Sequence, residues 1–86
     1  MDERTGLFEV NEEKRKHVSE TIKEVCCALT ERGYNPISQL VGYLISGDPG
    51  YISGYKECRN KILEFDRAEI ATIILEDYIR NNKWDV

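Results

Sequence analysis

Apolar residues recur every three or four positions along most of this chain, and no segment alternates convincingly between apolar and polar side chains. A spacing of three or four places apolar side chains on one face of an α-helix, whereas a half-buried strand needs a period of two. Because no pair of candidate strands presents itself, the sequence predicts an all-α fold.

The first predicted helix begins after Asn11 and ends before Gly33. Asparagine is a favoured N-cap, and the two glutamates that follow it suit the positive end of a helix dipole. Glycine is typical just past a helix end, where the backbone turns left-handed. The expected buried stripe of this helix consists of Val18, Ile22, Val25, Cys26 and Leu29.

The second predicted helix starts at Asn35-Pro36 and ends at Gly47, before the turn residues 48–50. Proline is well tolerated at the first helical position, because its missing N–H has no partner there. Gly42 lies on the far side of this helix. It either allows another backbone to approach closely or is simply tolerated. The expected apolar face consists of Ile37, Leu40, Val41, Leu44 and Ile45.

Two further helices are predicted, over about residues 55–64 and from Arg67 to about Asn81. Asp66 and Glu69 have the spacing of a capping box at the start of the last helix. The shorter helix is expected to bury Cys58, Ile62 and Phe65.

The 86 residues correspond to a single domain. Residues 1–10 show no sustained periodicity, and we expect them to form a flexible N-terminal arm. Residues 11–86 are then one helical domain, a compact bundle of about four short helices.

The last predicted helix is apolar over roughly two-thirds of its circumference. A helix on the surface of a small core needs a narrower stripe, so this one is either central to its own domain or buried against a second subunit. Symmetric dimers are the commonest assemblies, which favours an intertwined or face-to-face homodimer. The candidate interface residues are Ile70, Ile73, Ile74, Leu75, Tyr78 and Ile79.

The net charge of -4, from 16 acidic and 12 basic residues, argues against sequence-independent binding of nucleic acid. No nucleic-acid partner is therefore expected. A basic cluster at residues 14–17 keeps a small helical nucleic-acid-binding module as the alternative function.

The cysteine count is odd and includes the neighbours Cys26 and Cys27, which does not suggest a disulfide framework. No apolar run approaches the length of a membrane span, and the first residues do not resemble a signal peptide. The sequence therefore predicts a reduced, cytoplasmic protein that does not insert into a membrane.

No residue pattern indicates catalysis, a cofactor or a bound metal. His17, the single histidine, lies in a charged run that the first turns of a helix explain. Adjacent cysteines lack the spacing of zinc ligands, and residues 46–50 lack the frame of a phosphate-binding loop. We therefore expect a protein that is not an enzyme.

Residues 33–52, with the sequence GYNPISQLVGYLISGDPGYI, closely resemble the signature block of the IreB family of small regulatory phosphoproteins. The resemblance continues downstream, including an Arg-Asn pair. The positions that carry it include Gly33, Tyr34, Asn35, Pro36, Gly42, Tyr43, Gly47, Asp48, Pro49, Arg59 and Asn60.

The resemblance implies a non-catalytic substrate of a membrane-anchored, eukaryotic-like Ser/Thr kinase of Gram-positive bacteria, with a partner phosphatase that reverses the modification. It further implies a helical homodimer that modulates the cell-envelope stress response and cephalosporin resistance. The family is phosphorylated on a threonine of the N-terminal arm, three residues before a phenylalanine. Thr5 and Phe8 keep that spacing here, so the resemblance assigns Thr5 as the phosphorylation site.

Phosphorylation of Thr5 adds about -1.5 to -2 charges. The site lies a few residues before the first predicted helix, whose backbone amides form an anion-binding end. We expect the phosphate to dock there, near Lys14, Arg15 and Lys16.

Overall fold

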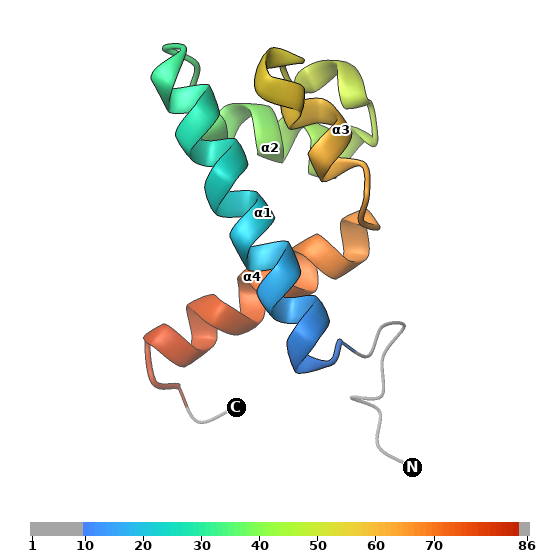
Figure 1. The fold of residues 1–86 in the computed structure, drawn as a ribbon. Coiled ribbons are helices and arrows are strands. Elements are labelled where there is room, and N and C mark those ends of the chain that lie inside the picture. The colour runs from blue at the N-terminus through green and yellow to red at the C-terminus, as the bar shows by residue number, and fades with distance from the viewer. Residues whose placement is uncertain (1–9, 85–86) are drawn as a thin grey trace.

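The computed structural model describes residues 10–84, and within this range every regular element is a helix (Figure 1). The all-α prediction is confirmed. In chain order, the elements are α1 (Glu12–Glu31), α2 (Pro36–Ser46), the 3-10 turns η1 (Pro49–Tyr51) and η2 (Tyr55–Glu57), α3 (Cys58–Ile62) and α4 (Arg67–Asn81).

The long helix α1 is the element on which the others pack. Figure 1 shows α2 and α3 beside its C-terminal part, while α4 crosses its N-terminal part. The core forms where these helices meet α1. The core side chains are Val18, Val25, Leu29, Leu40, Tyr43, Ile52, Cys58, Ile62, Phe65, Ile70 and Ile73.

The predicted limits of α1 are confirmed. The Asn11 side chain accepts a hydrogen bond from the backbone N–H of Lys14 at 2.8 Å, and Gly33 follows the helix with φ +86°. Val18, Val25 and Leu29 of the predicted stripe are buried, but Ile22 and Cys26 are only partly covered, and Thr21 is buried although it was not predicted. The reason is tertiary: helices approach α1 from several sides, which widens and rotates the face that it buries.

The ends of α2 also agree with the prediction. The Asn35 side chain accepts hydrogen bonds from the N–H groups of residues 37 and 38, and Gly47 ends the helix in the left-handed conformation. The predicted apolar face of α2 is only partly buried, with Leu44 packed against the core at its edge. Leu40 and Tyr43 point into the core, whereas Ile37, Val41 and Ile45 are exposed.

Position 42 needs glycine because a neighbouring side chain, and not another backbone, occupies the space beside it. A Cβ atom at this position would clash with the Tyr51 ring, first of all with its Cδ1 atom. The ring of Tyr51 therefore occupies the space that any larger residue at position 42 would need.

The third predicted helix is divided into η2 and α3, because Lys56 and Glu57 both adopt left-handed backbone conformations. Glu31 holds this turn: its Oε1 accepts from the Tyr55 hydroxyl at 2.8 Å and lies 2.8 Å from Lys56 Nζ. The contact with Lys56, and after it the contact with Tyr55, lowers the pKa of the Glu31 carboxyl. The predicted burial of Cys58, Ile62 and Phe65 is confirmed.

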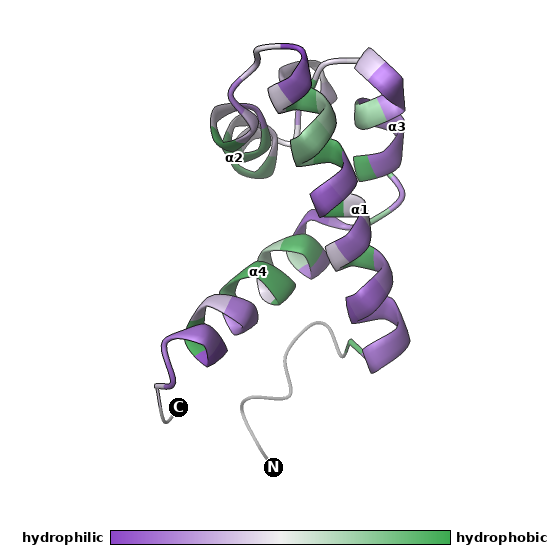
Figure 2. Cartoon of the chain, turned by 60° about the vertical axis from the view of Figure 1, so that its left-hand side comes forward, coloured by the Kyte–Doolittle hydropathy of each residue, from purple (hydrophilic) through white to green (hydrophobic). Residues whose placement is uncertain are grey.

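α4 begins after Asp66, as predicted, with the Asp66 N–H donating to Glu69 Oε1 at 3.2 Å. Arg67 Nη1 donates to the Leu44 carbonyl at 3.1 Å, which ties the start of α4 to the end of α2. Ile70 and Ile73 enter the core, and the rest of the helix then projects away from α2 and α3 (Figure 2).

The three cysteines are free thiols in different surroundings. Cys58 is fully buried and its Sγ lies 3.9 Å from the Val25 carbonyl oxygen, whereas Cys27 is exposed. Burial raises the pKa of the Cys58 thiol, and burial together with the neighbouring thiols raises the pKa of Cys26.

Replacing Gly42 with alanine is expected to destabilise the protein, since the new Cβ forces the Tyr51 ring to move. Overpacking costs about 1–3 kcal/mol and the improved helix propensity returns about 1 kcal/mol, so a net loss in free energy of unfolding is expected. Urea unfolding followed by circular dichroism measures it.

The matched control is Gly54→Ala, where a Cβ would meet nothing within 4 Å. In a Tyr51→Ala background, Gly42→Ala should become neutral or stabilising. An identical loss with and without the Tyr51 ring would contradict the assigned role of this contact.

Thiol reactivity should follow exposure. In the native protein at neutral pH, Cys27 is expected to be alkylated first and Cys58 only on unfolding, because the thiolate is the reactive form and burial suppresses it. Peptide mass spectrometry after brief alkylation measures this order. Native Cys58 reacting as fast as Cys27 would contradict the packing.

Candidate functional site

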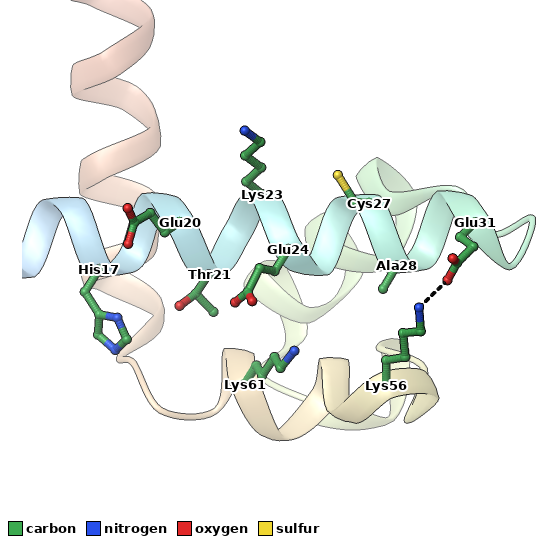
Figure 3. Close-up of a pocket in the computed structure, with 10 residues that line it drawn as sticks. All are labelled: His17, Glu20, Thr21, Lys23, Glu24, Cys27, Ala28, Glu31, Lys56 and Lys61. Atoms are coloured by element: carbon green, nitrogen blue, oxygen red, sulfur yellow. Dashed lines mark ion pairs between the residues drawn. The ribbon is translucent and has the colours of Figure 1, made fainter.

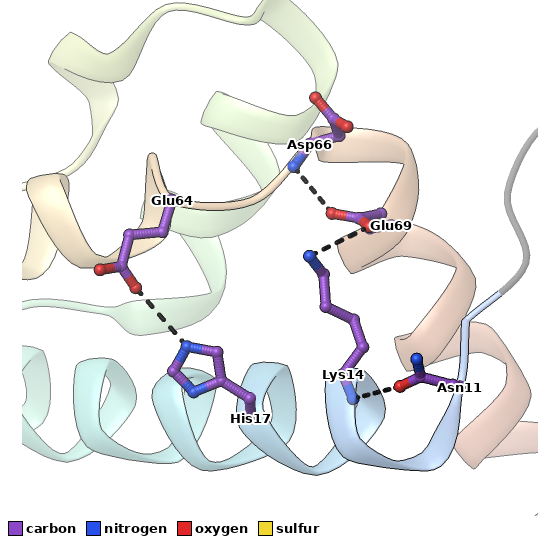
Figure 4. A network of polar contacts seen from close by, with 6 residues as sticks. All are labelled: Asn11, Lys14, His17, Glu64, Asp66 and Glu69. Atoms are coloured by element: carbon purple, nitrogen blue, oxygen red, sulfur yellow. Dashed lines mark hydrogen bonds and ion pairs between the residues drawn. The ribbon is translucent and has the colours of Figure 1, made fainter.

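Ion pairs join the first turns of α1 to α4. Arg15 Nη1 lies 2.6 Å from Glu76 Oε1, and Arg15 Nε lies 3.5 Å from Glu12 Oε1 on its own helix. Lys14 Nζ lies 3.5 Å from Glu69 Oε2, as Figure 4 shows. Two basic residues of the predicted cluster are therefore already paired with acidic residues of α4.

His17 belongs to the same region. Its Nε2 lies 3.8 Å from Glu64 Oε1 (Figure 4), and its ring meets Phe65 edge-to-face at 5.1 Å between centroids. The Lys14 ammonium lies 5.8 Å from the Phe65 ring centroid. These contacts make His17 part of the packing between α1 and the segment before α4.

The predicted interface residues of α4 fall into two groups. Ile70 and Ile73 are each 1% exposed and belong to the core of this chain. Ile74, Leu75 and Tyr78 are 42%, 59% and 55% exposed, and Ile79 is half-buried. The broad apolar circumference of α4 thus serves its own core on one side and leaves a row of large apolar side chains on the other. We call Ile74, Leu75 and Tyr78 the α4 outer face.

A shallow groove of about 400 Å³ adjoins the α4 outer face where α4 meets α1. Ile22 of α1 lines it together with Ile74 and Tyr78 of α4. Beyond the helix, the Trp84 ring meets Tyr78 edge-to-face at 5.4 Å and extends the apolar surface.

A second apolar surface lies on α2 and was not singled out from the sequence. Ile37, Val41 and Ile45 are four residues apart and form one row, with Ile37 72% and Ile45 79% exposed. Figure 2 shows this helix as strongly hydrophobic. The available signal was that α2 contains no charged residue, so one apolar face could not account for all its apolar side chains. We call this row the α2 outer face.

Most of the residues of the family-like segment have structural roles. Asn35 and Pro36 start α2, Gly42 accommodates Tyr51, Tyr43 is buried, and Gly47 ends the helix. Gly33 has a left-handed backbone after α1, and Tyr34 is 41% exposed before α2.

The turn after α2 is held by side chains on both sides of it. Asp48 Oδ1 accepts from the Gly50 N–H at 2.8 Å, and Pro49 opens η1. Arg59 Nε donates to the carbonyls of residues 49 and 52, at 3.1 and 2.9 Å. Asn60 Nδ2 donates to Glu57 Oε1 at 2.7 Å, beside the left-handed turn. The residues of this segment thus form a scaffold of helix ends and turns.

A larger groove of about 680 Å³ runs between α1 and the η2–α3 segment (Figure 3). Its walls mix acidic and basic side chains, and Lys56 is paired with Glu31 across it. Among the described residues, no group of three His, Cys, Asp or Glu side chains is placed to hold a metal ion. This groove has the character of a solvated, charged surface.

No helix within residues 10–84 combines the length and the hydropathy needed to span a membrane. The predicted phosphorylation site, Thr5, lies outside the described residues, as does nearly all of the predicted arm. Val10, the first described residue, packs against the core.

A comparison with known protein families finds a match that extends over nearly the whole chain. The model of the family described as IreB regulatory phosphoprotein matches residues 3–80, from the segment before α1 to the last turn of α4. The matched region contains α1, α2, α3 and the helical scaffold around residues 33–60. The chain therefore belongs to the IreB family of regulatory phosphoproteins.

Proposed function

We propose that this protein is a non-catalytic cytoplasmic regulator whose state is set by a membrane-anchored Ser/Thr kinase and the cognate phosphatase. The observation that carries the proposal is the family match over residues 3–80. In the proposed pathway, the protein modulates the cell-envelope stress response and cephalosporin resistance. Thr5 is the proposed phosphorylation site.

The second part of the proposal is a homodimer formed through the α4 outer face. Ile74, Leu75 and Tyr78 expose large apolar surfaces next to the groove lined by Ile22. Contiguous exposed apolar patches on a small protein are typical of interaction sites. A chain of 86 residues also gains stability from a partner, because it buries a smaller fraction of its own surface.

The alternative, a nucleic-acid-binding module, gains no support from the structure. It required a free basic cluster at residues 14–17. Lys14 and Arg15 instead lie beside Glu69 and Glu76 of α4, so residues 14–17 do not form the extended basic patch that contacts with several successive phosphates of a nucleic acid require.

Incubation with the Ser/Thr kinase of the source organism is expected to add one phosphate, located at Thr5 by mass spectrometry. Thr5→Ala should abolish the modification, and the cognate phosphatase should remove it. Thr30→Ala is the matched control, because Thr30 is exposed on α1 and its loss should change nothing. Undiminished phosphorylation of the Thr5→Ala protein would contradict the assignment of Thr5.

Light scattering at tens of micromolar is expected to give about twice the chain mass of 10.0 kDa. Leu75→Lys should weaken the dimer at least tenfold, about 1.4 kcal/mol, by placing a charge in an apolar interface.

The control for this experiment is Ile37→Lys, which places the same charge on the α2 outer face. A dimer that is lost with Ile37→Lys and retained with Leu75→Lys would assign the interface to α2 instead. A monomeric wild-type protein would refute the dimer itself.

A further inference from the structure

Arg15 is a largely covered cation whose donors are incompletely used. Its side chain is 14% exposed, and its Nε and Nη1 atoms are shielded from solvent. Within residues 10–84, neither atom has a hydrogen-bond partner in good geometry, although Nη1 lies 2.6 Å from Glu76 Oε1. A guanidinium offers five N–H donors in a planar fork, and its two carboxylate neighbours, Glu76 and the largely exposed Glu12, leave the donors on Nε and Nη1 without an aligned acceptor.

The surroundings of Arg15 favour an anion. It lies at the positive end of the α1 dipole, four residues after the N-cap Asn11, and next to Lys14. The first backbone amides are less suited to this role than the sequence indicated, because the Asn11 side chain already accepts from the Lys14 N–H. The basic side chains of this turn are thus the stronger anion ligands.

We propose that Arg15, assisted by Lys14, forms a phosphoryl-binding site, and that its occupant is the phosphate on Thr5 of the same chain. The inference rests on the proposed phosphorylation of Thr5. On this account the phosphate displaces Glu76 from Arg15, and phosphorylation exchanges one ion pair for another.

The chain is long enough for this contact. Thr5 and Val10 are five positions apart, and this stretch spans at most about 17 Å when extended. Arg15 lies only about 6 Å along the helix from Asn11, at 1.5 Å per residue. The phosphate can therefore return to the first turns of α1 without unwinding them.

Two differences favour the phosphate over Glu76 as the partner of Arg15. A phosphothreonine brings about -1.5 to -2 charges and three acceptor oxygens, which match the guanidinium fork better than one carboxylate oxygen. Glu76 is 44% exposed, so it regains water when it leaves Arg15. A fully buried carboxylate would resist displacement, because it would lose its partner without gaining solvent.

Loss of the ion pair between Arg15 and Glu76 affects the half of α4 that projects from the core. Beyond Ile73 this half leaves the core, and among the described residues Glu76 is its single point of ion pairing to α1. Glu76 directly follows Leu75 of the α4 outer face. Release of Glu76 thus loosens the surface proposed for dimer formation, and connects modification of the arm to that surface.

The test uses full-length protein with phosphothreonine installed chemically at position 5, so that no kinase is needed. Native ligation at Cys26 joins a synthetic segment of residues 1–25 to residues 26–86. NMR of the Arg15 Nε–Hε group and hydrogen exchange of residues 74–81 are compared with those of the ligated, unmodified chain. We expect a shifted Arg15 resonance and exchange that is severalfold faster in residues 74–81.

Matched variants make the exchange of partners visible. Glu76→Gln without phosphate should reproduce the faster exchange of residues 74–81, because it removes the same ion pair. Lys16→Gln, the neighbouring exposed cation, should leave both readouts unchanged. Arg15→Gln should abolish any further effect of the phosphate.

An unshifted Arg15 resonance in the phosphorylated chain would overturn the inference, as would unchanged exchange in residues 74–81. A full response of the unmodified chain to millimolar inorganic phosphate would also overturn it, by showing a general anion site and not one for the arm. Failure of the kinase to modify Thr5, with a positive result for the ligated protein, would refute the proposed function alone.

Discussion

Burial of α1 against every other helix is the constraint on which the structure depends. Val18, Val25 and Leu29 are completely covered, and each such burial contributes about 1.5–3 kcal/mol of hydrophobic stabilisation. α2, α3 and α4 each pack on α1, and α4 joins α2 through the Arg67 bond to the Leu44 carbonyl. The core of this small chain forms around one helix and is itself small. Each of the other helices therefore buries only part of its apolar surface in that core.

The segment of the chain that connects α1 to α4 contains the residues that carry the family resemblance. Its signature residues satisfy turns and helix ends, and Arg59 holds the turn at residues 49–52 with its guanidinium. Side-chain hydrogen bonds to the backbone hold this turn, and the Arg67 bond to the Leu44 carbonyl ties the start of α4 to the end of α2. The described part of the chain thus exposes two apolar helix faces, on a chain that belongs to a family of regulatory phosphoproteins.

Ion pairs link α1 to α4 near the point where the two helices cross. Lys14 and Arg15 lie within one turn of α1 and reach acidic residues two turns apart on α4, Glu69 and Glu76. In this cluster two cations lie among three carboxylates, Glu12 included, and one added dianion competes with the groups already in place. The cluster that pairs α1 with α4 is thus the one that we propose binds the phosphate.

The sequence by itself determined the local features: the helix limits at Asn11, Asn35-Pro36, Gly47 and Asp66, because caps and left-handed glycines depend on neighbouring residues. Family membership also followed from sequence, whereas the assignment of Thr5 stays a prediction. Only the tertiary structure decided that Ile70 and Ile73 face the core while Ile74 and Leu75 face outward. Periodicity shows which side chains share a face, but not which helix covers that face. It likewise could not reveal the pairing of Arg15 with Glu76, since these residues meet only after α1 and α4 cross.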